Sequence, residues 1–309
     1  MLNKYRKRNP DTLQRRAGLE AEYGITLKKD KGFYIYSRIL IIIVLIVILV
    51  PVLYIFSLSI RTKETIYQDF LFLIPKAVSI ENYVNAIEYA QTRLDVSFLE
   101  MFRNSIIATF SSITIAMVIA ALASFSFSNY RFKGKEFTFT AIIASFVIPA
   151  QVLLIPLFFI LRKVGIINTY LAVIIPYVGF IIPIAILILR SFFEQIPKEI
   201  KESAKIDGAS DLRIFLQIVI PLSKPAIASC IILLFLETWN EFIFALVFLQ
   251  NPKFQTIPVA IAKIAGGKYI VPIGTYSAAI MITIIPVLII FIIFQKWFIA
   301  GMTMGAIKG

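Results

Sequence analysis

Six long apolar runs constrain this chain more than any other feature, because a water-soluble fold cannot bury segments of that length and number. Each run has about 20 residues or more, the length that a helix needs to cross a hydrocarbon core of about 30 Å. The runs lack period-two alternation, which favours helices over barrel strands. They cover residues 39–60, 104–128, 137–161, 168–189, 225–249 and 276–298. We therefore expect an all-α integral membrane protein with six transmembrane helices.

Lys and Arg are distributed unequally between the two sides of such a bundle. With six spans, 21 of the 31 Lys and Arg residues fall on the side that holds both termini and the loop of residues 190–224. The positive-inside rule places this side in the cytoplasm and the chain in a cell membrane. The net charge of +13 largely follows from this asymmetry, so it indicates a lipid bilayer as partner and no nucleic acid.

The rare residue types exclude several chemistries. The sequence has one Cys and no His, which excludes a disulfide framework, a typical Cys/His zinc site and a His-based catalytic triad. The phosphate-binding pattern Gly-x4-Gly-Lys-Ser/Thr is absent, since Gly267-Lys268 is followed by Tyr269. We expect no catalytic residue, no metal site and no cofactor in this chain.

Residues 197–225 form an amphipathic stretch within the cytoplasmic loop. Pro197 suits the start of a first short helix, and Gly208 can take the left-handed conformation that ends it. Ser210 is a good N-cap for a second helix. The apolar stripe expected on that helix is Leu212, Phe215, Leu216 and Val219, with Pro221 at its end. An apolar stripe on a water-facing loop predicts docking into a partner's groove.

The same stretch resembles the Glu-Ala-Ala loop of ABC importer permeases. The matching motif is Glu202-Ser203-Ala204, Asp207-Gly208-Ala209 and Ile218-x-Ile220-Pro221, with Ser203 and Ile220 replacing the commoner Ala and Leu. In that family the loop is a coupling helix that fits into the ATP-binding subunit. The resemblance implies ATPase coupling by Glu202, Ser203, Ala204, Asp207, Gly208, Ala209, Phe215 and Pro221. The alternative is an ordinary amphipathic connector lying on the lipid surface.

Carboxylates occur inside the fifth apolar run. On a continuous helix Glu237, Asn240 and Glu241 share one arc while Trp239 points elsewhere. A carboxylate facing lipid near the bilayer centre costs at least about 2.5–3.5 kcal/mol, so this face should meet protein or a wet cavity. It could line a solute path, form a structural network with a partner permease, or relay protons or cations. The string Trp239-Asn240-Glu241-Phe242 resembles sugar-type ABC permeases, which makes Glu237, Trp239, Asn240 and Glu241 candidates for the solute path or gate.

The C-terminal tail carries another match. Residues 301–309 closely resemble the Gly-Leu-Thr-x-Gly-Ala-Val-Lys-Gly tail of the smaller permease subunit of maltose-type importers. In that family the tail enters the ATPase dimer, which implies that Thr303, Gly305 and Lys308 contact it; a frayed end is the alternative. The external loop of residues 250–275 contains Thr256-Ile257-Pro258, another feature of the family, and either reaches toward a solute-binding protein or is a plain connector.

These motifs occur in family order along nearly the whole chain, which is similar to permeases of carbohydrate-uptake ABC importers with the type I fold. The resemblance implies a cytoplasmic segment 1–38, a transmembrane domain 39–298 with the coupling loop 190–224, and a cytoplasmic tail 299–309. It also implies partners: a dimer of ATP-binding cassette subunits holding ATP and Mg²⁺, a second permease subunit, and an extracytoplasmic solute-binding protein. The expected function is import of a sugar or a related polyol or glycerol-phosphate-type solute. The alternative is an ion-gradient-driven secondary transporter using Glu237 and Glu241.

Overall fold

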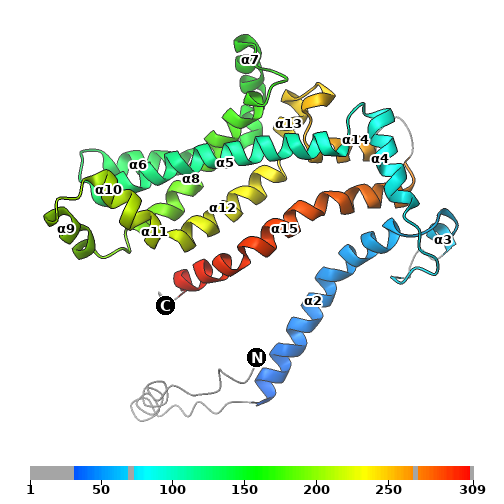
Figure 1. The fold of residues 1–309 in the computed structure, drawn as a ribbon, viewed down its shortest axis with the longest axis horizontal. Helices are drawn as coiled ribbons and strands as arrows, with labels where there is room; N and C mark the ends of the chain where they lie inside the picture. The colour runs from blue at the N-terminus through cyan, green and yellow to red at the C-terminus, as the bar shows by residue number, and fades with distance from the viewer. Residues whose placement is uncertain (1–30, 69–72, 267–270, 307–309) are drawn as a thin grey trace. The chain divides into compact units, whose positions relative to one another are not determined.

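The computed structural model describes residues 31–68, 73–266 and 271–306, and these residues are predominantly helical (Figure 1). Among them, β pairing is limited to an isolated bridge between Arg61 and Val78. The expected all-α class is therefore confirmed for the described residues. The contacts divide the chain into two compact units, Met1–Tyr54 and Ile55–Gly309. The division into segments 1–38, 39–298 and 299–309 stays a prediction.

Four of the six expected spans are continuous helices. They are α2 (Lys31–Ser59), α5 (Phe98–Asn129), α8 (Leu171–Phe193) and α15 (Ile273–Ala306). Each contains a stretch apolar and long enough to cross a membrane. Since Leu, Ile and Val dominate these stretches, a helix that pairs every backbone N–H internally is the conformation that lipid allows.

The third apolar run, residues 137–161, is not the continuous helix that we expected. It forms α6 (Lys135–Ser145), the 3₁₀ turn η1 (Ala150–Leu153) and α7 (Leu154–Val164), with a bend of 85° between its two halves. Pro149 lies at this break, where it lacks an N–H and restricts the backbone of the residue before it. The third run is therefore broken at this proline, although its hydrophobicity is continuous.

The fifth run, residues 225–249, is also interrupted. α12 (Lys224–Trp239) ends at Asn240, and α13 (Ile243–Phe248) begins three residues later. At 1.5 Å per residue, α12 is about 24 Å long, short of a full span. Its start is bent by 76° against the preceding helical stretch Asp211–Leu222. The described residues thus hold four continuous membrane-length helices, and up to six spans if each bent pair counts as one.

The core lies where α5 packs along α8, with α12 beside both and α15 beside α12 (Figure 1). Small buried side chains on α5, among them Ala108, Ala116 and Ala120, let the helices approach closely. Ser124 Oγ donates a hydrogen bond of 3.2 Å to the carbonyl of Ile186 on α8. The pair α5–α8 is thereby fixed along its length.

Short elements gather at the two ends of this second unit. One end carries α3 (Lys63–Gln68), α4 (Glu81–Arg93), η3 (Pro252–Phe254) and α14 (Ile257–Gly266). The other carries α9 (Lys198–Ile206), α10 (Asp211–Ile214), the π-helical turn η2 (Phe215–Val219) and α11 (Ile220–Leu222). Figure 1 shows α4 and α14 at one end of α5 and α9 and α10 at the other. The chain therefore builds a separate surface on each side of the bundle.

The first part of the 250–275 loop is anchored to the start of α5. Asn104 Nδ2 donates to the carbonyls of Lys253 at 2.9 Å and Gln255 at 3.0 Å, and Asn104 Oδ1 accepts from Tyr170 Oη at 2.7 Å. Ser105 Oγ accepts from the backbone N–H of Ile257 at 2.9 Å. These bonds hold residues 253–257 in place; whether the loop meets a solute-binding protein stays a prediction.

Candidate functional site

The helix–turn–helix that the sequence predicts is present in residues 197–225, which we call the 197–225 segment. Gly208 has φ 82°, the left-handed conformation that favours glycine, and no atom lies within 4 Å of where its Cβ would be. The N–H of Ala209 donates to the carbonyl of Ala204 at 2.9 Å, which closes the turn. Ser210 Oγ accepts from the N–H of Arg213 and caps α10 as expected. Glu202, Ser203 and Asp207 are exposed on this hairpin.

The apolar face of the second helix differs in part from the expected stripe. Phe215 and Val219 are buried as predicted, but Leu212 and Leu216 are exposed by 62% and 54%. Ile214 is buried in their place, so the buried face runs through Ile214, Phe215 and Val219 instead of through the two leucines. The Phe215 ring packs on Phe125 of α5 with centroids 5.1 Å apart. One apolar face thus holds the segment to the bundle, while the exposed leucines remain outside it.

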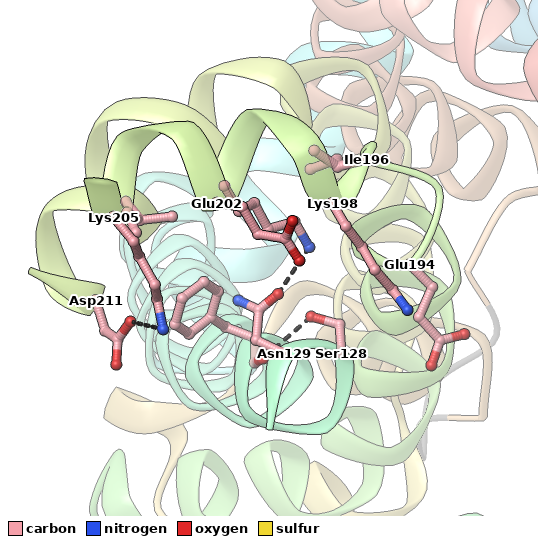
Figure 2. A pocket seen from close by; sticks show the side chains of 11 residues that line it. Ser128, Asn129, Glu194, Ile196, Lys198, Glu202, Lys205 and Asp211 are labelled. Carbon is pink, nitrogen blue, oxygen red and sulfur yellow. Dashed lines mark hydrogen bonds and ion pairs between the residues drawn. The ribbon is translucent and has the colours of Figure 1, made fainter. Parts of the chain in front are cut away.

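Polar side chains attach the segment to the ends of the long helices. Lys201 Nζ donates to Asn129 Oδ1 at 2.7 Å and to the carbonyl of Phe193 at 3.3 Å. Tyr130 Oη donates to Asp211 Oδ2 at 2.7 Å, and Lys205 Nζ lies 3.0 Å from Asp211 Oδ1. Figure 2 shows Asn129 at the end of α5 facing Glu202, with Lys205 and Asp211 at one edge. These groups surround a cavity of about 410 Å³.

The surroundings of Asp211 and Lys201 at this cavity shift the pKa of each group. Hydrogen bonds from Tyr130 and Lys205 lower the pKa of the Asp211 carboxyl below its ordinary value, so it is ionised at neutral pH. Burial, with a smaller effect of Lys198, lowers the pKa of the Lys201 amine. The hydrogen bonds from the Lys201 ammonium to Asn129 and to the Phe193 carbonyl therefore replace the water that burial removes.

Arg190 joins three helices next to this cavity. Its guanidinium bonds to Glu136 of α6 at 2.8 Å and to Glu194 at 2.7 Å. The guanidinium carbon lies 3.9 Å from the centroid of the Phe139 ring and 5.8 Å from that of Phe127. Arginine stacks on aromatic rings while its fork of donors remains available, which explains this residue type at the junction.

Glu237 is exposed on α12 and lines two cavities. A cavity of about 580 Å³ is bounded by the break in the third run and by α8, and a smaller one of about 200 Å³ lies next to Tyr177 and Glu241. Gln151 of η1 lines both. Within the described residues, Glu237 makes no hydrogen bond or ion pair. Its carboxylate and the Gln151 amide are thus available to a solute with hydrogen-bonding groups.

Glu241 has a different environment from Glu237, because the helix that would align them ends at Trp239. Its carboxylate accepts from the N–H of Phe244 at 2.8 Å and from that of Ala245 at 3.2 Å. It also accepts from Tyr177 Oη of α8. Glu237 and Glu241 therefore do not lie on one continuous helix as expected: Glu241 caps the start of α13, although both carboxylates line the smaller cavity.

Trp239 and Asn240 flank this break. Trp239 is 4% exposed and its ring stacks on Phe235 with centroids 5.2 Å apart, so it belongs to the core of this chain. Asn240 is exposed, and its Nδ2 donates to the carbonyl of Leu236 at 2.8 Å. Of the four candidates for the path or gate, Glu237 and Glu241 thus line a cavity, Asn240 is exposed outside the two cavities, and Trp239 is packed in the core.

The C-terminal candidates are described only in part. α15 continues as a helix to Ala306, so Thr303 and Gly305 lie in its last turns, while Lys308 lies outside the described residues. Their contact with an ATPase stays a prediction. No group of three or more Cys, Asp or Glu with metal-binding geometry occurs among the residues that the structure describes.

Sequence reasoning missed Lys201, Asn129, Tyr130, Arg190 and Gln151. The partners of the first four lie on other elements, as in the Lys201–Asn129 pair, which is 72 positions apart in sequence. A buried lysine on a short polar helix gives no sequence signal of its own. For Gln151 a signal existed, because an amide next to Pro149 within an apolar run marks a break in a span.

Comparison with known proteins gives consistent matches. A family model described as binding-protein-dependent transport system inner membrane component matches residues 112–304. The trehalose/maltose transport system permease protein MalG of Thermococcus litoralis is 37% identical over 238 residues, covering 77% of this chain and 84% of that protein. The trehalose transport system permease protein SugB of Mycobacterium tuberculosis is 34% identical over 261 residues, covering 84% of this chain and 92% of that protein.

A solved structure extends the similarity to three dimensions. It is a bacterial ABC transporter involved in the import of the acidic polysaccharide alginate. One of its chains matches with a TM-score of 0.75 and 26% sequence identity, covering 89% of this chain and 99% of that chain. The broken third and fifth runs and the helical hairpin of the 197–225 segment thus belong to a fold that is already known in an importer.

Proposed function

Because the chain belongs to the family of binding-protein-dependent transport system inner membrane components, we propose that it is the smaller, six-helix permease subunit of a sugar importer. Family membership makes it a multi-pass membrane component of an ABC importer, and a transport subunit rather than an enzyme. The ion-gradient alternative finds no support in the family match. Relatives named for trehalose and maltose, and a structural match named for alginate, support a carbohydrate as the solute.

The 197–225 segment is the surface that we assign to the ATPase. The observation that carries this assignment is its helical hairpin at one end of the bundle, with Ile206, Leu212 and Leu216 exposed by 87%, 62% and 54%. Apolar side chains on a water-facing hairpin are stabilised by a partner's groove. Glu202, Ser203 and Asp207 form the polar part of the same surface, and Ala204, Gly208 and Ala209 shape its turn. Phe215 holds it to the bundle, and Pro221 is exposed in the short helix α11 at its end.

ATP binding in a dimer of partner subunits then moves the 197–225 segment, and Thr303, Gly305 and Lys308 of the tail add a second contact. ATP and Mg²⁺ are held by those partners, and this chain carries no cofactor. Both termini lie in the cytoplasm, as the Lys and Arg distribution favours. An extracytoplasmic binding protein delivers the solute on the other side, where α4, α14 and the 250–275 loop lie.

The solute path runs past Glu237. Its carboxylate accepts hydrogen bonds from sugar hydroxyls, and Gln151 supplies an amide group in the same two cavities. Trp239 and Glu241 hold the break between α12 and α13 that gives Glu237 access to both cavities. A second permease, a different chain in a heterodimer, completes the path opposite this face.

ATP-driven uptake by the reconstituted complex tests this function. The complex with its binding protein, in liposomes loaded with ATP, should accumulate trehalose or maltose, and a catalytically inactive partner ATPase should abolish uptake. Gly208→Val should lose uptake while the complex still assembles, because a β-branched residue resists φ 82°. Gly208→Asn is the matched control, since Asn tolerates this conformation. Uptake that persists with the inactive ATPase would refute the proposal.

A further inference from the structure

Lys201 is buried in a position where a lysine is expected to be exposed. It lies on the short polar helix α9, yet only 9% of its surface is exposed, whereas Lys198 and Lys205 on the same helix are exposed. Lysine is rarely buried unless its ammonium group is paired, because desolvation of a cation is unfavourable. Its burial therefore requires specific acceptors.

The acceptors lie at the C-terminal ends of α5 and α8, the two helices that pack along each other in the core. Asn129, whose Oδ1 accepts from Lys201 Nζ at 2.7 Å, is the last residue of α5. Phe193, whose carbonyl accepts at 3.3 Å, is the last residue of α8. A cation at helix C-termini also complements the carbonyls that have no partner within the helix. One ammonium group thus joins α9 to α5 and α8 simultaneously.

We propose that Lys201 is a positioning residue that fixes α9 to the C-terminal ends of α5 and α8, so that a displacement of the 197–225 segment is passed directly to both helices. The proposal rests on the assignment of that segment to the ATPase. Without this bond, the segment would follow the ATPase while the long helices lag behind. A second attachment, between Tyr130 and Asp211, holds α10 to the same end of α5.

The N-terminal part of α5 is bonded to the 250–275 loop, so a movement of α9 that reaches α5 also reaches the other side of the bundle. α5 is continuous over 32 residues, about 48 Å, and its first turns are bonded to residues 253–257 through Asn104 and Ser105. A movement imposed at Asn129 is therefore carried to the external loop by one unbroken helix. The cavity of about 410 Å³ beside Lys201 leaves room for the side chains around the bond to rearrange.

The test compares solute transported with ATP hydrolysed in the reconstituted complex with its binding protein and trehalose or maltose. Lys201→Met keeps the unbranched stem and removes the donors. Since a hydrogen bond from a charged group shifts an equilibrium by about tenfold or more, the ratio of solute to ATP should fall about tenfold while ATP hydrolysis persists. Lys133→Met, exposed beyond the end of α5 and outside the 197–225 segment, is the matched control and should leave the ratio unchanged.

The other end of the bond provides an independent variant. Asn129→Leu should lower the ratio as Lys201→Met does, and Asn129→Asp should keep it near the wild-type value because a carboxylate also accepts from the ammonium. The double variant Lys201→Met with Asn129→Leu should be no worse than either single variant. If Lys201→Met prevents assembly, the two Asn129 variants decide: equal ratios for Leu and Asp would overturn the proposal.

Spin labels provide a readout that does not depend on transport. In a Cys230→Ser background, labels at Lys198→Cys and Arg131→Cys report the distance between α9 and the end of α5. The distance should stay unchanged on ATP binding in this background and should change once Lys201→Met is added. A wild-type-like ratio in Lys201→Met, together with ATP-driven uptake, would overturn the inference and leave the proposed function standing. Absence of any ATP-driven uptake in the unmodified complex would instead overturn both.

Discussion

Replacing Glu241 by Gln is expected to destabilise the break between α12 and α13. The carboxylate accepts three hydrogen bonds, two from the N–H groups of Phe244 and Ala245 and one from Tyr177. A glutamine has one carbonyl oxygen with two lone pairs, so at least one of these donors loses its acceptor. A bond to a charged group contributes about 1.5–3 kcal/mol, and an orphaned buried N–H adds to the loss, giving about 2–4 kcal/mol.

Thermal unfolding of the purified complex measures this loss. For a chain of this size, each 1 kcal/mol lowers Tm by roughly 2 °C, so Glu241→Gln should lower Tm by about 4–8 °C. Tyr177→Phe removes one of the three bonds and should lower it by less. Combining the two changes should give less than the sum of the single effects, because both remove the same bond.

Glu237→Gln is the matched comparison, four residues earlier with the same chemical change. Because Glu237 makes no hydrogen bond or ion pair within the described residues, its replacement should leave Tm within about 1 °C. It should instead raise the solute concentration for half-maximal uptake by up to about tenfold, since the acceptor of the solute hydroxyl is no longer charged.

The opposite pattern would refute this reasoning. If Glu241→Gln abolished uptake with no change in Tm, the Glu241 carboxylate would act on the solute or the gate rather than hold the start of α13. If Glu237→Gln lowered Tm as much as Glu241→Gln, Glu237 would belong to a structural network with the partner permease. Either result would require exchanging the roles that we assign to these two residues.

Three further changes test other parts of the structure. Asn104→Ala should lower Tm by about 4–8 °C, because it removes bonds worth about 2–4 kcal/mol in total between α5, Tyr170 and the external loop; hydrogen exchange at residues 253–257 should rise with it. Arg190→Leu should lower Tm by about 2–4 °C, and Arg190→Lys should recover less than half of that, because lysine cannot bond to two carboxylates while stacking on Phe139. Leu212→Asp should reduce co-purification of the ATPase at least tenfold, whereas Ile80→Asp, exposed at the opposite end, should not; equal effects would exclude the 197–225 segment as the docking surface.

Local backbone chemistry explains which features could be predicted from the sequence. The turn at Gly208 and the cap at Ser210 depend on one residue each and its immediate neighbours, so the residue types alone specify them. The four continuous spans were equally accessible, because lipid leaves an apolar run of that length with few alternatives to a helix.

The break in the fifth run could not be predicted from hydrophobicity, because it depends on a tertiary partner, whereas the break in the third run lies at Pro149 and had a local signal. α12 ends where the Glu241 carboxylate captures the N–H groups of Phe244 and Ala245, and this arrangement is held by Tyr177 of α8, 64 positions away. The expected placement of residues 237–241 on one helical face assumed that the helix continues through residue 241, but α12 ends at Trp239. The attachment of Lys201 to Asn129 was missed for the same reason, since neither residue is unusual in its own segment.

The positions of the breaks relative to the continuous helices determine how such a bundle can move. α5 and α8 are unbroken, pack along each other and meet the 197–225 segment through Lys201, so they move as one body. The third run bends by 85° near Pro149, and the fifth run is interrupted at Asn240, where α12 ends. Both breaks lie beside cavities that Glu237 lines. If the 197–225 segment is driven by an ATPase, as we propose, α5 and α8 must change their position relative to these breaks, because sharp bending occurs at interruptions rather than within the packed α5–α8 pair. Access to Glu237 is then controlled at the breaks near Pro149 and Asn240, at a distance from the 197–225 segment.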